Sequence, residues 1–184
     1  MLQKAMKLAL EWHRDQDRKY MIQGLHVPYI VHPMAVMKMV WTWGAGTESI
    51  MCAAVCHDLI EDTFMTYEFL RAIIGDQAAD IVKELTLEEY SDKEKYLKSF
   101  SDSSIEALII KIADRLDNVK DYMSNRPHYA KEYFDKAKDL FEALTSRVIE
   151  IQDKFGEAVY KNIIDSYLAV KISLSMSDIN EKEN

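Results

Sequence analysis

The chain has 184 residues and a formal net charge of −8, with 48% hydrophobic and 29% charged residues. This length fits one domain with a sizeable core, and only 5 Gly and 3 Pro leave little material for a turn-rich β architecture. The surplus of negative charge disfavours a broad grip on nucleic acid, because Lys and Arg contacts carry most of the affinity for phosphate backbones. We therefore expect one helical domain and no nucleic-acid partner.

Three stretches in the N-terminal half have apolar residues at helical spacing. They cover residues 2–12, 34–43 and 48–60, and Thr47 is a suitable N-cap for the third. Residues 20–27 are expected to form a loop, because Gly24 and Pro28 interrupt the pattern. The third stretch is apolar almost all round, which is typical of a helix enclosed by other elements.

Further helices are predicted over residues 67–74, 77–85, 104–119, 129–155 and 157–174, with a polar connection at 88–101. The polar tail, 175–184, is expected to be disordered, so residues 1–174 form one domain. No window approaches the roughly 20 uninterrupted apolar residues that span a bilayer, which favours a cytoplasmic protein without a membrane partner. The oligomeric state is open, and a homo-oligomer is compatible with the sequence.

Four ionisable residues end the third predicted helix: His57, Asp58, Glu61 and Asp62. Glu61 follows His57, and Asp62 follows Asp58, by about one helical turn, so all four groups are expected on one side. Burying such groups without partners costs several kcal/mol, which requires ion pairs, a metal or a wet cavity. Glu61 and Asp62 could instead be solvated charges, although acidic groups at a helix C-terminus oppose the helix dipole.

A second polar strip lies on the predicted helix 104–119. One face of this helix is apolar, through Ile105, Leu108, Ile109, Ile112 and Leu116. Asp114, Asp117 and Asn118 share another face. The sequence therefore places polar groups on a second helix that is otherwise buried.

His32 stands before Pro33 at the start of the second predicted helix, where a rigid approach can direct its imidazole inward. Two His and two Asp would form a mixed nitrogen and oxygen site that leaves positions for water and substrate, as a catalytic divalent ion requires. Each residue also has a plain structural interpretation: His32 as a helix-entry residue, and Asp114 as an ion pair with Lys111 or Arg115. The combination of all these groups favours the metal site.

Four segments resemble the HD-domain phosphohydrolases, and more narrowly the hydrolase domain of the RelA/SpoT homologues, including the stand-alone small alarmone hydrolases. In chain order they are HRDQDRK at 13–19, PYIVHP at 28–33, AAVCHDLIEDT at 53–63 and KIADRLDN at 111–118. The resemblance runs from residue 2 to about residue 150. It implies an all-α, single-domain helical bundle of the HD type around a divalent metal site.

The resemblance also implies roles for particular residues. One divalent ion, typically manganese, would be bound by His32, His57, Asp58 and Asp114. Glu61 and Asp62 would act on the nucleophilic water, Arg18 and Lys19 would face a small-molecule nucleotide, and Asn118 would contact it. The implied reaction removes pyrophosphate from the 3′ position of ppGpp or pppGpp and returns GDP or GTP. Basic residues beside a metal suit such a polyanion.

Two departures from the family pattern leave the substrate open. Asp117 stands where the family usually has His, which adds negative charge near a polyphosphate, and the loop over 20–27 is longer than usual and contains His26. No synthetase domain fits after about residue 150, so we expect hydrolysis only. The alternatives are hydrolysis of another nucleotide (a 5′-nucleotide, an adenosine alarmone or a phosphorylated dinucleotide) and a nucleotide-binding sensor without turnover. The sensor is disfavoured because the sequence keeps every residue of the implied site.

Overall fold

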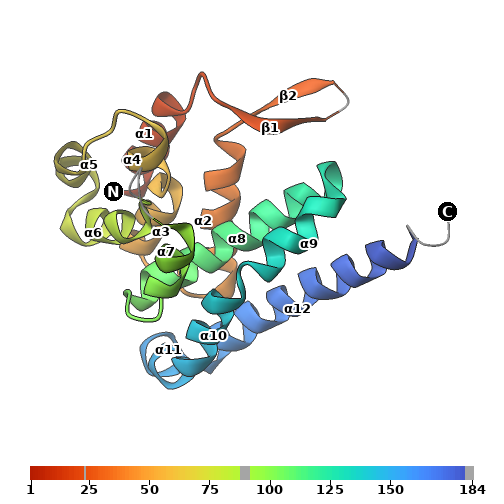
Figure 1. Ribbon diagram of the computed structural model, residues 1–184. Coiled ribbons are helices and arrows are strands. Elements are labelled where there is room, and N and C mark those ends of the chain that lie inside the picture. Colours follow the sequence, from red (N-terminus) through yellow and green to blue (C-terminus); the bar gives the residue numbers. More distant parts are fainter. Residues whose placement is uncertain (23, 88–91, 181–184) are drawn as a thin grey trace.

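The computed structural model describes residues 1–22, 24–87 and 92–180 (Figure 1). The all-α prediction is confirmed, with one short hairpin added to the helices. In chain order the elements are α1 (Leu2–Trp12), β1 (Asp17–Ile22), β2 (Leu25–Pro28), α2 (Val31–Trp43), α3 (Glu48–Cys56), α4 (Leu59–Asp62), α5 (Tyr67–Ile74), α6 (Asp76–Leu85), α7 (Lys93–Ser99), α8 (Ile105–Asn125), α9 (Pro127–Asp135), α10 (Lys138–Ser146), α11 (Val148–Phe155) and α12 (Glu157–Asn180).

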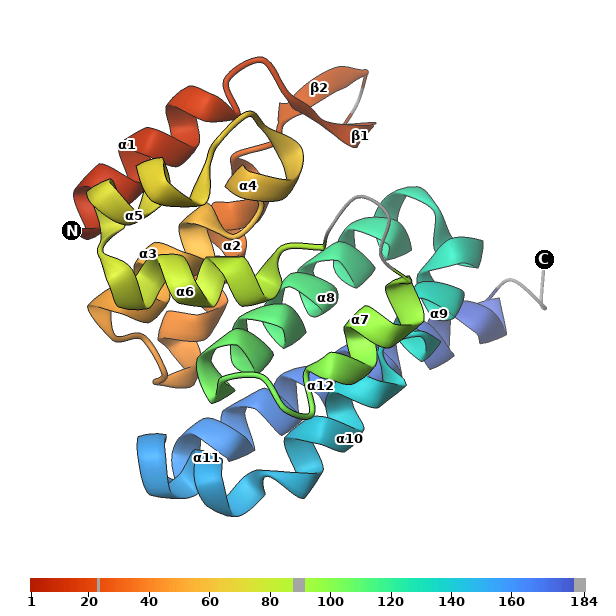
Figure 2. The ribbon, with the colours of Figure 1, turned by 60° about the vertical axis from the view of Figure 1, so that its left-hand side comes forward.

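Helix α8 runs through the middle of the molecule (Figures 1 and 2). Helices α2, α3 and α6 pack on one side of it, and α9, α10 and α12 pack on the other. The predicted apolar face of α8 is confirmed, since each of its residues is at most 1% exposed: Ile105, Leu108, Ile109, Ile112 and Leu116. Burying one such side chain contributes roughly 1.5–3 kcal/mol, so this face holds α8 firmly in place.

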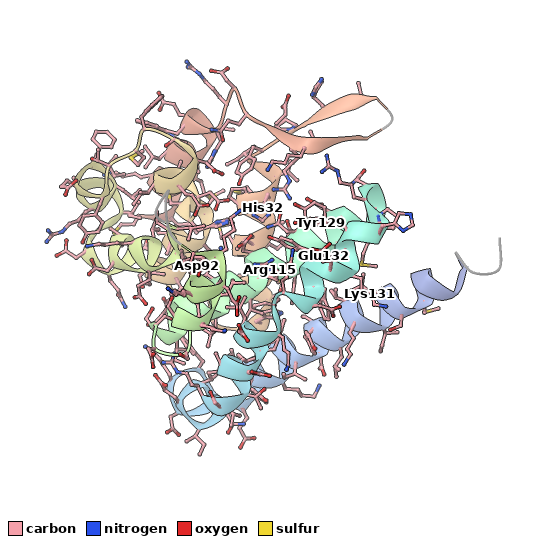
Figure 3. The ribbon with its side chains drawn as sticks, in the orientation of Figure 1. His32, Asp92, Arg115, Tyr129, Lys131 and Glu132 are labelled. Carbon is pink, nitrogen blue, oxygen red and sulfur yellow. The ribbon has the colours of Figure 1, made fainter. Side chains whose placement is uncertain are left out.

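Helix α2 begins at Val31, one turn earlier than the apolar pattern indicates, and carries His32 in its first turn (Figure 3). Pro33 is tolerated there because the first turn of a helix has no intrahelical partner for its backbone N–H groups. The helix ends at Trp43, and Gly44 follows as its cap with a φ of +93°, a left-handed conformation that favours glycine.

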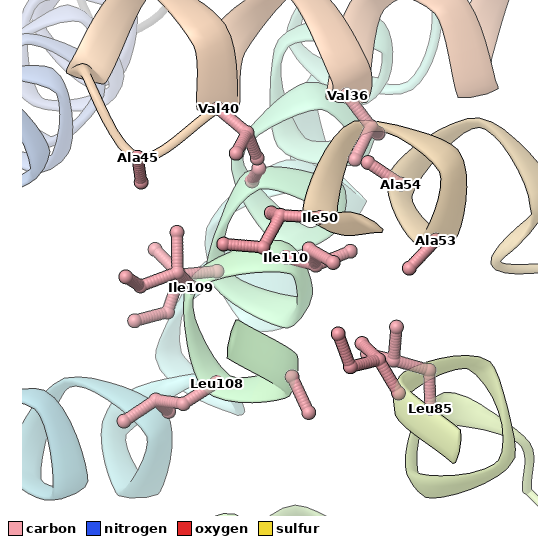
Figure 4. Packing of buried hydrophobic residues seen from close by; sticks show 14 of the residues in the cluster. Val36, Val40, Ala45, Ile50, Ala53, Ala54, Leu85, Leu108, Ile109 and Ile110 are labelled. Atoms are coloured by element: carbon pink, nitrogen blue, oxygen red, sulfur yellow. The ribbon is translucent and has the colours of Figure 1, made fainter. Parts of the chain in front are cut away.

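The centre of the core lies where α2, α3 and α8 meet (Figure 4). Val36 and Val40 of α2 and Ile50 of α3 are at most 1% exposed and pack with the apolar face of α8. Ala53 and Ala54 are fully buried, and their small side chains let α3 approach its neighbours closely. This close packing explains why α3 is apolar almost all round, as its sequence indicated.

The single helix expected over 48–60 is wrong in one respect: it breaks after Cys56. His57 and Asp58 form the junction, and α4 follows as a single turn. The backbone of Asp58, at φ −96° and ψ −2°, departs from helical geometry. Apolar periodicity does not reveal this break, because the apolar pattern continues through Leu59 and Ile60. The N-cap is as predicted, with the Thr47 hydroxyl accepting a hydrogen bond from Ile50 N at 3.3 Å.

The loop expected over residues 20–27 is also corrected, because most of it belongs to an antiparallel hairpin, β1–β2. Asp17 pairs with Pro28 and Ile22 with Leu25. Within the described part of the chain these are the only strands. The hairpin places Arg18 beside the C-terminal part of α8, where its guanidinium contacts Asp121. An irregular loop would not hold Arg18 in this position.

The helix expected over 129–155 is divided into α9, α10 and α11, with breaks near Ala137 and Arg147. Gly156, at φ +91°, separates α11 from α12, in agreement with the predicted boundary. Helix α12 continues to Asn180, beyond the predicted end at Leu174. Part of the polar connection, 88–91, and the tail residues 181–184 lie outside the described residues. In the described part of the chain, none of the helices has the length and hydropathy that crossing a membrane requires.

Candidate active site

The four residues predicted as metal ligands lie close together, and three of them, His32, Asp58 and Asp114, line one cavity. His32 comes from α2, His57 and Asp58 from the junction of α3 and α4, and Asp114 from α8. His32 Nε2 lies 3.2 Å from Asp114 Oδ1 and 3.7 Å from Asp58 Oδ2. His57 Nε2 lies 3.0 Å from Asp58 Oδ2 and 4.0 Å from Asp114 Oδ1. Both imidazoles are almost fully buried, at 1–2% exposure.

Each imidazole is oriented by a hydrogen bond at its other nitrogen. His57 Nδ1 lies 2.8 Å from the carbonyl oxygen of Ala54, and His32 Nδ1 lies 2.7 Å from Asp117 Oδ2. Carbonyl and carboxylate oxygens only accept, so both Nδ1 atoms donate. The two Nε2 atoms therefore face the shared space between Asp58 and Asp114.

The donor set fits a divalent ion. Ligand atoms of His32, His57 and Asp58 lie within 4.8 Å of one another. His57 Nε2 is buried beside Asp58 and forms no hydrogen bond with any described residue. When Nδ1 alone holds a proton, Nε2 and the carboxylate oxygen turn lone pairs toward each other, and either a cation between them or a second proton on the ring stabilises this arrangement.

The surroundings of His32 favour its protonated form. Burial lowers the pKa of His32, but hydrogen bonds with Asp114 and Asp117, and the charge of Asp58, outweigh burial and raise the pKa to about 9. Burial also opposes ionisation of Asp58, yet the adjacent His57 and His32 hold the pKa of this carboxyl below its usual range. The cluster is thus built for anionic carboxylates around a positive centre.

Asp114 is the most heavily bonded member of the cluster. Its Oδ2 lies 2.9 Å from Lys111 Nζ, and its Oδ1 accepts from Asn118 Nδ2 at 2.5 Å. Burial opposes ionisation of Asp114, but Lys111 and the imidazoles hold its pKa well below the usual value. The ion pair with Lys111 that the sequence left as an alternative is therefore present together with the cluster.

Glu61 and Asp62 lie beside the cluster of predicted ligands and face the same cavity. The Tyr29 hydroxyl lies 2.6 Å from Asp58 Oδ2 and 2.9 Å from Asp62 Oδ2, and its single proton can serve only one of them fully. Glu61 Oε2 accepts a hydrogen bond from Leu87 N at 3.0 Å. Burial raises the pKa of both carboxyls, and the charge of Asp58 adds to this at Asp62. Such carboxylates are suited to accept a proton from water.

The cavity above the cluster has a volume of about 380 Å³, which is within the range of small-molecule sites. Its lining is mostly polar. Basic groups come from three elements: Arg18 and Lys19 from β1, Lys93 from α7 and Lys111 from α8. His32 on α2 and Tyr129 on α9 both line this cavity (Figure 3). Carboxylates line the cavity as well, so it suits an anionic ligand that carries a ring when a cation is bound at the cluster.

The residues predicted to contact substrate all line this cavity, but two of them, Arg18 and Asn118, are bonded to other side chains there. Arg18 donates to Asn118 Oδ1 at 2.7 Å and to Asp121 Oδ2 at 3.1 Å from Nε. The Asn118 amide is thus bonded at both ends, to Arg18 and to Asp114. Lys19 is exposed at the rim.

Several lining residues were not predicted as site residues: Asp121, Tyr122, Tyr129 and Tyr133. The three tyrosine rings contact one another, with centroids 4.9–5.7 Å apart. Helical spacing from Asn118 to Asp121 and Tyr122 could have indicated two of them. The other two, Tyr129 and Tyr133, lie on α9, and no spacing in the sequence indicates that α9 packs beside the cavity.

Comparisons with known proteins place the chain in a family. The family described as HD domain matches residues 5–150, so the chain belongs to the HD domain family. The Drosophila melanogaster guanosine-3′,5′-bis(diphosphate) 3′-pyrophosphohydrolase MESH1 is 30% identical over 155 residues, which span 79% of this chain and 85% of that protein. A solved structure described as a metazoan orthologue of SpoT that hydrolyses ppGpp matches with a TM-score of 0.73 and 26% identity, over 91% of this chain and 94% of that one. The resemblance drawn from the four motifs is confirmed.

Longer relatives are matched over only part of their length. The bifunctional (p)ppGpp synthase/hydrolase SpoT of Escherichia coli is 27% identical over 198 residues, which span 99% of this chain but 27% of SpoT.

A second solved structure, from Listeria monocytogenes, matches with a TM-score of 0.53 and 25% identity, over 72% of this chain and 98% of that one.

Proposed function

We propose that this chain removes pyrophosphate from the 3′ position of ppGpp or pppGpp, returning GDP or GTP, with one divalent ion bound by His32, His57, Asp58 and Asp114. The observation that carries the proposal is the joining of this cluster to a cavity with Arg18, Lys19 and Lys93. Relatives named as 3′-pyrophosphohydrolases support the substrate. Manganese is the ion we propose, because a mixed imidazole and carboxylate set accommodates it.

The reaction consumes one water. Its oxygen bonds to the phosphorus next to the 3′ oxygen, the bond from phosphorus to that oxygen breaks, and the 3′ oxygen takes up a proton. A bound divalent ion would lower the pKa of a water and neutralise charge on phosphoryl oxygens. Glu61 or Asp62 accepts the proton that the water loses, which their raised pKa values favour. Arg18, Lys19 and Lys93 hold the polyphosphate by charge-assisted hydrogen bonds.

Product analysis tests this proposal. Wild type, His57→Ala, Asp58→Asn and Glu61→Gln are incubated with ppGpp and Mn²⁺, and GDP and pyrophosphate are quantified. We expect product from wild type, none from the two ligand variants, and a loss of about 100-fold or more in kcat for Glu61→Gln with Mn²⁺ binding retained. Asp165→Asn, an exposed carboxyl on α12, is the matched control and should behave as wild type.

Two other outcomes favour the alternative functions. Equal or better turnover of a nucleotide without a 3′ diphosphate would favour a different substrate. The hairpin is the structural reason to consider this, because residues of β1 line the cavity. Binding of ppGpp and Mn²⁺ without any product would favour a sensor. The cytoplasmic location, the lack of a nucleic-acid partner and a homo-oligomeric state stay predictions.

A further inference from the structure

Asp117 has an unexpected position for a residue that the sequence places next to a polyphosphate site. Its carboxylate does not line the cavity in the described part of the chain. It turns instead behind the imidazole of His32, where Oδ2 lies 2.7 Å from Nδ1. The negative charge that seemed unfavourable for substrate is therefore directed at a proposed metal ligand.

Helix α8 holds both ring nitrogens of His32. Asp114 and Asp117 are one helical turn apart, so their side chains lie on the same face of α8. Asp114 Oδ1 is 3.2 Å from Nε2, and Asp117 Oδ2 is 2.7 Å from Nδ1. The side chain of His32 is 1% exposed, and each of its nitrogens lies within contact distance of a carboxylate oxygen. These contacts fix the rotation of the imidazole and the location of its Nδ1 proton.

The two histidines of the cluster are supported differently. His57 Nδ1 donates to a neutral carbonyl oxygen, that of Ala54, whereas His32 Nδ1 donates to a carboxylate. A carboxylate behind an imidazole increases the electron density at the opposite nitrogen and strengthens it as a ligand. His32 thus has an anionic partner behind its ring, whereas His57 has a neutral one.

From this geometry we propose that Asp117 is a positioning residue that orients His32 and increases its affinity for the divalent ion. The proposal rests on the metal site of the proposed function, but not on the identity of the substrate. Asp117 acts through His32 and touches neither the ion nor the nucleotide.

Metal binding by the purified full chain tests the proposal. The dissociation constant for Mn²⁺ is measured by electron paramagnetic resonance of the free ion in wild type, Asp117→Asn, Asp117→Ala and the control Asp165→Asn. We expect Asp117→Ala to bind 10- to 100-fold more weakly, by the usual effect of removing such a partner. Asp117→Asn should lie between, because its amide oxygen still accepts from Nδ1 but carries no charge. The control should match wild type.

A spectroscopic measurement separates positioning from a general structural effect. In ¹⁵N-labelled metal-free protein, the Nδ1 proton of His32 should give a protected signal that shifts in Asp117→Asn and is lost in Asp117→Ala. Circular dichroism should show the same helix content in all variants. Asp117→Ala that binds Mn²⁺ as tightly as wild type would overturn the proposal, and so would a wild type that binds no divalent ion. A wild type that binds Mn²⁺ but does not hydrolyse ppGpp would overturn only the proposed function.

Discussion

At the scale of single residues, Asp114 shows how the site is kept anionic inside the bundle. It is 5% exposed, and its two oxygens contact Lys111, Asn118 and His32. Taking a carboxylate out of water costs several kcal/mol, and only close opposite charges and hydrogen bonds offset this cost. Lys111 provides the permanent positive charge, since pairing with Asp114 outweighs burial and raises its pKa. Lys111 is therefore a charged partner of Asp114 that does not depend on a bound ion.

The first prediction concerns this ion pair. Lys111→Met keeps most of the volume of the side chain but removes its charge, which leaves Asp114 buried without its main counter-charge. We expect the free energy of unfolding of the metal-free protein to fall by about 3 kcal/mol, measured by urea denaturation in EDTA. Mn²⁺ should restore part of this loss, because the ion supplies positive charge at the same carboxylate.

The matched control for this prediction is Lys120→Met, the same substitution at an exposed position of the same helix. It should change stability by less than about 0.5 kcal/mol. Equal effects of the two substitutions would show that the Lys111 charge does not compensate Asp114.

At the scale of elements, α8 is the support of the site. It supplies Lys111, Asp114, Asp117, Asn118 and Asp121 from one side. Most of its apolar residues are buried against α2, α6, α10 and α12. Because interiors are close-packed, a change in the buried face affects how precisely the polar face is held. Core packing around α8 therefore matters for the site as well as for stability.

A truncation in this buried face should be costly. Ile110 is fully buried among the residues where α2, α3 and α8 meet (Figure 4). Ile110→Ala removes methyl and methylene groups and leaves a cavity that neighbouring helices fill only partly, so we expect a loss of about 2–5 kcal/mol in the free energy of unfolding. Ile149→Ala on α11, where the side chain is 71% exposed, is the control and should be nearly neutral. Urea denaturation of both variants measures the difference, and similar midpoints would contradict this account of the core.

The elements also show how far sequence reasoning reaches. Helical periodicity predicted α3 and α8, because apolar residues at helical spacing indicate a buried helix. It did not find the break at His57 and Asp58, because the apolar pattern continues through Leu59 and Ile60. The convergence of His32, His57, Asp58 and Asp114 was expected from motifs. The bonding of Asp117 to His32 depends on the angle between α2 and α8, and no local pattern encodes such an angle.

At the scale of the whole molecule, the proposed ion would connect segments that are far apart in the chain. Its ligands come from α2, the junction of α3 and α4, and α8. The folded chain brings them together, whereas the unfolded chain does not, so the ion binds the native state preferentially. The buried hydrophobic residues form one cluster, and none of the four proposed ligands belongs to it. We therefore expect a metal-free protein that is folded but less stable.

The last prediction follows from this linkage. At a free Mn²⁺ concentration about 100 times the dissociation constant, binding to the native state alone contributes about 2.7 kcal/mol. For a chain of this size each kcal/mol raises Tm by about 2–4 °C, so Tm should rise by roughly 5–11 °C relative to protein in EDTA. Asp58→Asn should lose most of this rise, because it removes an anionic ligand, while Asp165→Asn should keep it. Differential scanning calorimetry with and without Mn²⁺ measures both. An equal rise in Asp58→Asn and wild type would place the stabilising ion elsewhere, because only an ion that contacts Asp58 makes the shift depend on its charge.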